Sequence, residues 1–201
     1  MNKQLLIQVM ARRKTVSDDD LLDRLLPVLT AHGPDGLTLA LAGAAAGFSA
    51  ATLLQRFRSR EAMIEAILLR AWDRLDATTA AADNAAPDGP EGAIALLGEL
   101  MPMGSVDTAM TDGLLLLRED FRNPMLRQRG AAWGERLATA LGRRLAPDPV
   151  EGKRLGWQMA QVWQGALIWW AFTREGDAAA YVSGALRAWC RSTAGLRRGP
   201  H

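Results

Sequence analysis

The sequence predicts an all-α protein. Ala, Leu, Arg and Glu, which favour helices, dominate the 201 residues, whereas β-branched residues are scarce and Tyr occurs once. Apolar residues recur at the 3.6-residue spacing of a helix face, and clusters of Gly, Pro and Asn separate these stretches. Nearly half of the residues are hydrophobic, so the chain can bury a substantial core.

The first 33 residues are predicted to form an arm followed by a helix. Residues 1–16 are expected to form a loose arm that ends in Arg12-Arg13-Lys14. Ser17 is a good N-cap for a helix with a one-face leucine stripe, which Pro27 should kink and His32-Gly33 should end.

Two short helices should follow, joined by a tight turn. Thr38 is the expected N-cap of a helix that stops at Gly47, and Ser49 opens another that ends at Phe57. Gly43 lies inside the first of these helices and costs about 1 kcal/mol relative to Ala, so tertiary packing must hold that helix in place. Two short helices joined in this way can dock into a DNA major groove.

The remaining helices are longer and more apolar. Ser59 should start a helix that runs to about residue 82, and residues 83–90 form the clearest loop of the chain. Asn123-Pro124 is a strong helix-start signal. The further helices are expected at about 91–100, 107–121, 124–145, 150–174 and from 177 to near the end. The most apolar stretch, 157–172, contains three Gln residues and is too short to span a membrane.

Composition and motifs argue against an enzyme. The net charge is +2, and residues 1–60 carry eight Lys and Arg against five Asp, which is weak support for a surface that faces phosphates. His32 and His201 are the only histidines, and no Gly-x-Ser-x-Gly, Gly-x-Gly-x-x-Gly or phosphate-loop motif occurs. We therefore expect no catalytic site, no metal and no cofactor. Cys190 is the only cysteine, which excludes an intramolecular disulfide and fits a reducing, cytoplasmic setting.

Residues 17–76 resemble the DNA-binding domain of the tetracycline-repressor (TetR) family of bacterial transcriptional regulators. The family pattern is matched by Phe48-Ser49, Thr52-Leu53, Phe57 and Glu61, with Arg60 where Lys is usual, and by the placement of Gly36-Leu37-Thr38 and Gly47. Two features depart from it: Leu54 replaces the usual Tyr, and the second helix carries uncharged residues at Ala40, Leu41, Ala44 and Ala45.

The resemblance implies a nine-helix TetR-like fold with a three-helix head and a helical ligand-binding and dimerisation domain. The expected division is a flexible basic arm at 1–16, a helix-turn-helix DNA-binding domain at 17–60, and the second domain at 61–201.

The resemblance also implies which residues contact DNA. Helix starts would hold phosphates at Thr38 and Arg60, and the third helix would face the groove with Ser49, Ala50, Ala51, Thr52, Gln55 and Arg56. The chemistry agrees, because Arg can bind guanine and Gln can bind adenine, each worth about 1–3 kcal/mol of discrimination. Two interpretations of Arg12-Arg13-Lys14 stay open: they reach an adjacent minor groove, or they only keep the end of the chain soluble.

The second domain should hold an effector and a partner subunit. Met and aromatic residues could line a cavity for an apolar or aromatic small molecule, and the residues chosen are Met103, Met110, Leu114, Leu117, Phe121, Trp133, Met159 and Trp163. The helix at 150–174 is apolar on two sides, so a second subunit is expected to cover one of them. The expected homodimer interface comprises Gly165, Ile168, Trp169, Phe172, Val182, Ala185 and Trp189.

These expectations lead to a mechanism and an alternative. A two-fold dimer requires a palindromic operator in double-stranded DNA, and effector binding that tilts the helix at 59–82 would release the regulator, as a repressor, with a roughly 5- to 150-fold change in affinity. The alternative is a TetR-fold helical protein that binds small molecules or lipids and no longer binds DNA, which the uncharged second helix and Leu54 favour.

Overall fold

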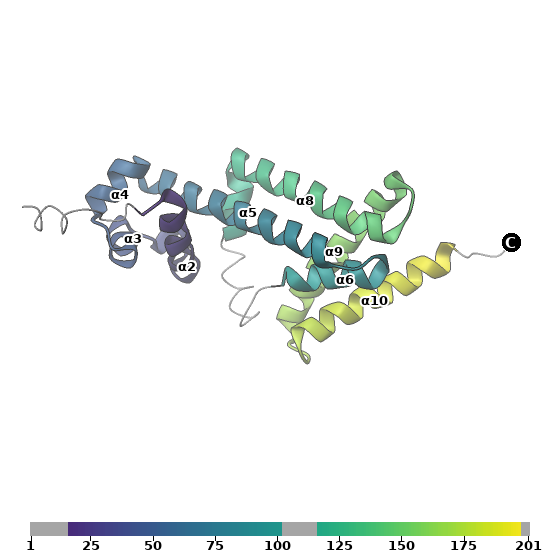
Figure 1. The fold of residues 1–201 in the computed structure, drawn as a ribbon. Coiled ribbons are helices and arrows are strands. Elements are labelled where there is room, and N and C mark those ends of the chain that lie inside the picture. Colours follow the sequence, from purple (N-terminus) through teal and green to yellow (C-terminus); the bar gives the residue numbers. More distant parts are fainter. Residues whose placement is uncertain (1–15, 102–115, 198–201) are drawn as a thin grey trace, which may run out of the picture. The chain divides into compact units, whose positions relative to one another are not determined.

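The computed structural model describes residues 16–101 and 116–197 and consists there of helices and connecting turns, which confirms the predicted all-α class (Figure 1). The expected helix at 107–121 falls mostly outside these ranges, although residues 116–122 are helical. The chain divides into two compact units, residues 1–70 and 71–201. The boundary lies ten residues beyond position 60, because the first turns of the long helix pack within the first unit.

The first unit contains α2 (Asp18–Gly36), α3 (Leu39–Ala46), α4 (Ala50–Phe57) and the first turns of α5 (Arg60–Ala85). The hydroxyl of Ser17 accepts a hydrogen bond from the Asp20 N–H at 3.0 Å, as its expected role as N-cap requires. Leucine and other apolar side chains from all four helices form the small core, which includes Leu21, Leu25, Leu29, Leu37, Ala42, Leu53, Met63 and Ile67.

The break in α2 lies at a different residue from the one the sequence indicated. The backbone stays helical at Pro27, whereas Gly33 has φ of 68° and ψ of 168° and separates the main helix from a last turn that contains Pro34. A glycine adopts this conformation at little cost, so the chain turns there towards α3. The predicted kink at Pro27 is therefore replaced by a sharp turn at the predicted C-cap.

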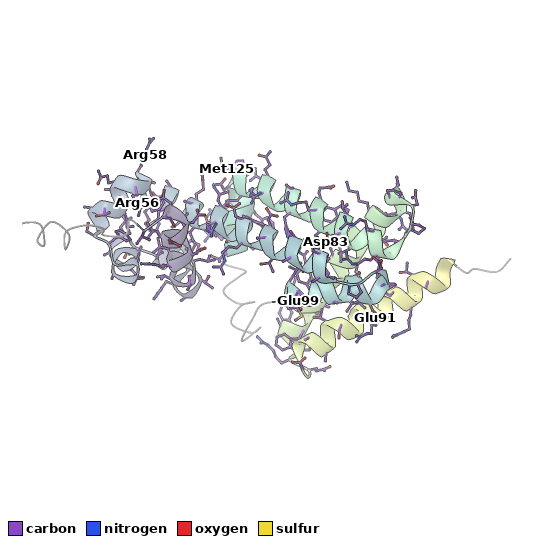
Figure 2. The ribbon with its side chains drawn as sticks, in the orientation of Figure 1. Arg56, Arg58, Asp83, Glu91, Glu99 and Met125 are labelled. Atoms are coloured by element: carbon purple, nitrogen blue, oxygen red, sulfur yellow. The ribbon has the colours of Figure 1, made fainter. Side chains whose placement is uncertain are left out.

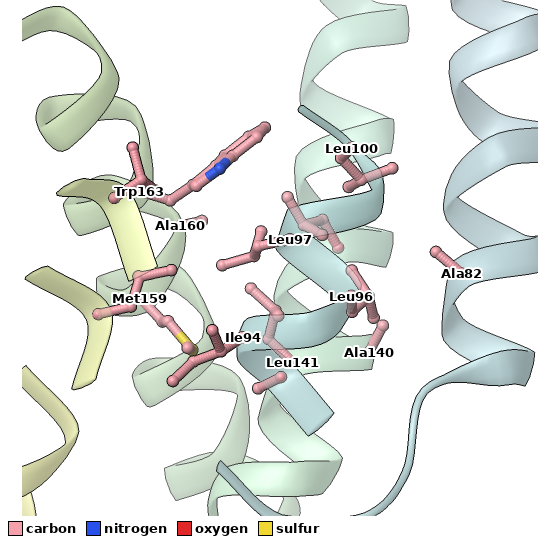
Figure 3. Packing of buried hydrophobic residues seen from close by; sticks show 14 of the residues in the cluster. Ala82, Ile94, Leu96, Leu97, Leu100, Ala140, Leu141, Met159, Ala160 and Trp163 are labelled. Carbon is pink, nitrogen blue, oxygen red and sulfur yellow. The ribbon is translucent and has the colours of Figure 1, made fainter. Parts of the chain in front are cut away.

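The second unit contains the rest of α5 together with α6 (Gly89–Glu99), α8 (Pro124–Leu145), α9 (Pro149–Thr173) and α10 (Ala178–Arg197). Asn123 caps α8 as expected, because its Oδ1 accepts from the Met125 N–H at 2.8 Å. One hydrophobic cluster joins these helices; Figure 3 shows part of it, with Ile94, Leu96 and Leu97 of α6 among side chains of α8 and α9 such as Leu141 and Met159.

The backbones of α8 and α9 are in direct contact where glycines face each other. A Cβ placed on Gly142 would lie 2.5 Å from the carbonyl carbon of Gly152, and a Cβ on Gly156 would collide with the backbone of Ala138. Side chains of any size would push the helices apart at both points. The pair therefore packs without a side-chain layer between the two backbones at these crossings.

One arginine of α8 fixes the end of α5, which extends to Ala85 and not to the predicted residue 82. The guanidinium of Arg144 is buried and donates to the carbonyls of Asp83, Ala86 and Pro87, at 2.6, 3.0 and 2.9 Å. It also pairs with the Asp83 carboxylate at 2.6 Å. Carbonyls at a helix end lack partners within the helix, so this side chain supplies them.

The electrostatics of Asp83 follow from this contact. Partial burial raises the pKa of its carboxyl, but hydrogen bonds from Arg144 and Arg143 outweigh the burial and hold that pKa below its usual range. The charged form of Asp83 therefore stabilises the fold at this end of α5.

Two tryptophans connect α5 with its neighbours. Trp72 donates its indole N–H to Asp120 at 3.0 Å, and Trp133 of α8 donates to the hydroxyl of Thr79 at 2.9 Å. The two indole rings lie 5.9 Å apart at 53°. Burial raises the pKa of the Asp120 carboxyl, since the hydrogen bond from Trp72 only partly offsets the lost hydration.

No described helix combines the length and the apolar character that crossing a membrane requires. Within the same residues no His, Cys, Asp and Glu side chains gather as a metal site would require.

Candidate DNA-binding surface

The helix α4 has one buried edge and one exposed edge. Leu53 is fully buried, while Ser49, Ala50, Ala51 and Gln55 are exposed. The arrangement follows from the sequence, because Leu53 is the apolar residue that enters the small core whereas the residues of the exposed edge are small or polar. The exposed edge presents methyl groups, one hydroxyl and one carboxamide, which are groups that can contact bases.

Two hydroxyls cap the helices of the turn. The Thr38 hydroxyl accepts from the Leu41 N–H at 3.1 Å, and the Ser49 hydroxyl accepts from the Thr52 N–H at 3.0 Å. The Thr52 hydroxyl lies 2.8 Å from that of Ser49. Both caps stand at exposed helix starts, where N–H groups of the first turn favour phosphate oxygens.

The guanidinium of Arg56 is engaged by the protein itself. It donates to the Val16 carbonyl at 2.9 Å, pairs with Asp18 at 2.8 Å and lies over the Phe48 ring. To bind guanine through both of its terminal nitrogens, Arg56 would have to give up these contacts. The geometry thus ties the start of α2 to α4 through the residue chosen from the sequence as a base reader.

Arg60 is engaged in a different way. Its guanidinium donates to the Leu37 carbonyl at 2.6 Å and to the Pro34 carbonyl, so it closes the turn between α2 and α3. The sequence placed it at a phosphate; the structure gives it a capping contact within the head. Its remaining terminal nitrogen lies 3.6 Å from Glu61.

Arg58 is a candidate that the sequence analysis did not select. It follows α4 with a φ of 70° and ψ of −38°, a conformation that costs free energy for any residue with a Cβ. Its side chain is exposed and has no ion pair within the residues that the structure describes. Figure 2 shows it projecting away from the head, whereas Arg56 lies against it. The positive φ distinguishes Arg58 from the other arginines of this region, and it cannot be read from the sequence.

Comparison with known families finds a match within the first unit, which contains the three-helix head formed by α2, α3 and α4. Residues 21–67 match the model of the N-terminal domain described as "Bacterial regulatory proteins, tetR family". The match spans the turn between α3 and α4 and ends three residues before the end of the first unit. In this segment the chain is similar to the TetR family.

Solved structures of TetR-family and related regulators share the fold. A transcriptional regulator from Rhodococcus sp. Rha1 is 16% identical with a TM-score of 0.71, over 88% of this chain and 95% of that one. A TetR-family transcriptional regulator from Streptomyces coelicolor is 18% identical with a TM-score of 0.63, over 86% and 93%. A candidate transcriptional regulator from Saccharomonospora viridis, solved in complex with choline, is 16% identical with a TM-score of 0.67, over 85% and 93%. Comparison with curated proteins finds no significant match.

The residues that were expected to bind an effector lie in different surroundings. Trp133, Met159 and Trp163 are buried together in the core cluster of the second unit. Leu117 and Phe121 are exposed, Phe121 by 64%, so they do not line an interior cavity as described; they lie outside the cluster because the helix at 116–122 turns them to the surface. Met103, Met110 and Leu114 lie outside the described residues.

The grooves on the second unit are lined by other residues. A groove of about 650 Å³ lies between α9 and α10 and is lined by Arg154, Gln158, Gln161 and Trp189, among others. A second, of about 400 Å³, lies between α5 and α8 and includes Asp76, Asp83 and Arg136. Two of the glutamines noted in the sequence thus line a surface groove, and the third, Gln164, is exposed.

The expected dimer residues divide into exposed and buried ones. Ile168, Trp169 and Phe172 of α9 are exposed, Phe172 by 76%, and the rings of Trp169 and Phe172 lie 5.8 Å apart. Val182 is 2% exposed and belongs to the chain's own core, so it is removed from the interface; α10 turns it towards α6 and α9. Gly165, Ala185 and Trp189 are partly buried, the last two against the same core.

Proposed function

We propose that this chain is a dimeric, sequence-specific, DNA-binding transcriptional regulator of the bacterial cytoplasm that represses genes until a small molecule releases it. One observation carries the proposal. The helix α4, in the position of the family's recognition helix, buries Leu53 and exposes Ser49, Ala50, Ala51 and Gln55 as one edge. Thr52 lies on the same helix, Arg58 follows it, and Thr38 caps the neighbouring α3; their side chains suit phosphate or sugar oxygens.

The exposed apolar face of α9 supports the dimer. Ile168, Trp169 and Phe172 form a patch that a monomer would leave in water at a cost of about 25 cal/mol per Å² of apolar surface. A second copy of the same patch fits an isologous two-fold interface. Two recognition helices related by that axis require a palindromic operator.

The long helix α5 is the element proposed to couple effector to operator. Its first turns contribute Met63 and Ile67 to the core of the head, and its later turns contribute Trp72 and Thr79 to contacts in the second unit. An apolar or aromatic effector that repacks Trp133 or Trp163 would change the surroundings of α5. A coupling of roughly 1–3 kcal/mol is typical for such a linkage.

The test begins with operator sites mapped by genomic footprinting and measured by gel shift. Gln55→Glu places a negative charge on the proposed groove edge and should weaken operator binding at least roughly 10-fold. Gln128→Glu makes the same change at an exposed position of α8 and should leave the affinity unchanged. Equal effects of the two variants would contradict the proposed surface. Addition of the true effector should then release the wild-type protein.

A second function has specific support. The helix α3 carries no charged residue, Leu54 is exposed where the family usually has Tyr, and Arg56 and Arg60 are engaged within the head. These features favour a TetR-fold protein that binds small molecules or lipids without DNA. Binding to random duplex at several salt concentrations separates the two: a regulator shows a negative slope of log affinity against log salt, and the alternative shows no binding.

A further inference from the structure

The indole nitrogen of Trp163 is a buried hydrogen-bond donor without an acceptor in the part of the chain that the structure describes. Trp163 lies on α9 and is only 6% exposed. In Figure 3 its indole extends from α9 towards the end of α6, where Leu97 and Leu100 lie. Buried donors are nearly always paired in folded proteins, so an unpaired one calls for a physical explanation.

Trp133 provides an internal comparison in the same cluster. It is 8% exposed, and its indole N–H donates to the Thr79 hydroxyl at 2.9 Å. Thr79 in turn donates to the Leu75 carbonyl at 2.7 Å. Among the residues that the structure describes, one buried indole N–H thus has an acceptor and the other has none.

The surroundings of Trp163 restrict what could accept its hydrogen bond. The cluster consists of apolar side chains. Among the described residues Thr79 is the only polar residue that is buried as a whole, and the buried guanidinium of Arg144 is already bonded at the end of α5. Since no basic side chain is buried there, a carboxylate or phosphate would lose its hydration without compensation. A neutral oxygen needs only the single donor that the indole offers.

We propose that Trp163 donates its indole N–H to the oxygen of an uncharged, apolar effector such as a ketone or an ester. The inference rests on the proposed function in so far as it describes the effector of that regulator. It names the chemical class that would suit this donor: one hydrogen-bond acceptor on an otherwise apolar molecule, with anions excluded.

The first test compares two matched variants of the full-length protein without any ligand. Trp163→Phe and Trp133→Phe remove the same atoms from similarly buried positions, so the lost volume is comparable. Trp133→Phe also breaks a hydrogen bond and should lower Tm by roughly 2–4 °C more than Trp163→Phe does. If Trp163→Phe lowers Tm as much as Trp133→Phe, the Trp163 donor is already bonded in the free protein and the proposal is overturned.

The second test follows the indole N–H signals by NMR in protein labelled with ¹⁵N-tryptophan, with Trp163 assigned from its Phe variant. Acetophenone should move the Trp163 signal downfield, whereas ethylbenzene, which lacks the oxygen, should not, and benzoate should not bind. The Trp163→Phe change should weaken acetophenone binding roughly 3- to 10-fold and leave ethylbenzene unaffected.

An unmoved Trp163 signal up to the solubility limit of acetophenone overturns the proposal, as does an equal response to ethylbenzene. Both tests use protein free of DNA. A chain that passes them and yet fails to bind DNA in the gel shift contradicts the regulator and leaves the role of Trp163 standing.

Discussion

Gly43 of α3 lies against the backbone of the turn that leads into α4: a Cβ at Gly43 would stand 2.6 Å from the carbonyl oxygen of Phe48. It would also stand 3.3 Å from the Ala50 nitrogen. The amide of Phe48 donates to the Gly43 carbonyl at 2.9 Å, which closes the turn. The interior glycine that costs helix stability is thus the residue that allows α3 and α4 to meet.

Gly43→Ala should therefore destabilise the head and weaken operator binding. The new methyl group meets backbone atoms, which cannot move aside as a side chain can, and such overpacking costs about 1–3 kcal/mol. Gly98→Ala in α6 is the matched control, because a Cβ there meets nothing within 4 Å. It should be neutral or stabilising by up to about 1 kcal/mol. Urea denaturation of both variants measures the difference; a stabilised Gly43→Ala protein would contradict the packing described.

Two replacements of Arg58 should separate backbone strain from DNA contact. Arg58→Gly relieves the positive φ and should raise stability by roughly 0.5–1 kcal/mol, whereas Arg58→Ala keeps the strain. Both remove the charge and should reduce the slope of log affinity against log salt by about 0.9. Thermal unfolding and salt-dependent gel shifts provide the two readouts. Unchanged salt slopes would exclude a phosphate contact by Arg58.

A charge in the exposed patch of α9 should produce monomers. Phe172→Glu places a carboxylate on the proposed two-fold face, where burying it without a partner costs several kcal/mol. Val150→Glu makes a comparable change at the other end of α9, on a side chain that is also exposed, and should leave the dimer intact. Analytical ultracentrifugation gives the oligomeric state. A dimer that persists in Phe172→Glu would place the interface elsewhere.

Asp83→Asn should make stability less dependent on pH. The depressed pKa of Asp83 means that its ion pairs stabilise the fold above the ordinary carboxyl pKa, and that this stability is lost as the pH falls through the folded-state pKa. The variant should be less stable than wild type by about 1–2 kcal/mol at pH 7, and the difference should close as the pH falls below the folded-state pKa of Asp83. Asp88→Asn changes an exposed carboxyl without a side-chain capping bond and should have no effect. Urea midpoints at several pH values provide the measurement.

Local signals in the sequence predicted most of the helix starts. Ser17, Thr38, Ser49 and Asn123 cap their helices through their own side chains, because an N-cap acts on N–H groups two or three residues away. Helix ends that depend on distant residues could not be predicted in this way. The end of α5 rests on Arg144, which lies some sixty residues further along the chain.

The site residues also divide into those set by local sequence and those set by distant contacts. The exposure of Gln55 and burial of Leu53 are set by spacing along one helix and were predictable. Arg56 contacts Val16, and Arg60 contacts Pro34. These contacts depend on how α2 packs in three dimensions against the residues of α4 and α5, which local sequence does not indicate. Val182 illustrates a further limit, since an apolar stripe on a helix does not indicate whether its own chain or a second subunit covers it.

The contacts between Gly142 and Gly152, and between Gly156 and Ala138, restrict how α8 and α9 could move in the response to an effector that we propose. If α8 slid or tilted against α9, backbone atoms of the two helices would collide at these points. We therefore expect the two helices to move together as a rigid body. In the proposed mechanism, a rearrangement that changes operator binding would therefore occur in helices that pack through side chains. Substitutions meant to change the proposed response should therefore avoid these glycines and target the helices that pack against the α8–α9 pair.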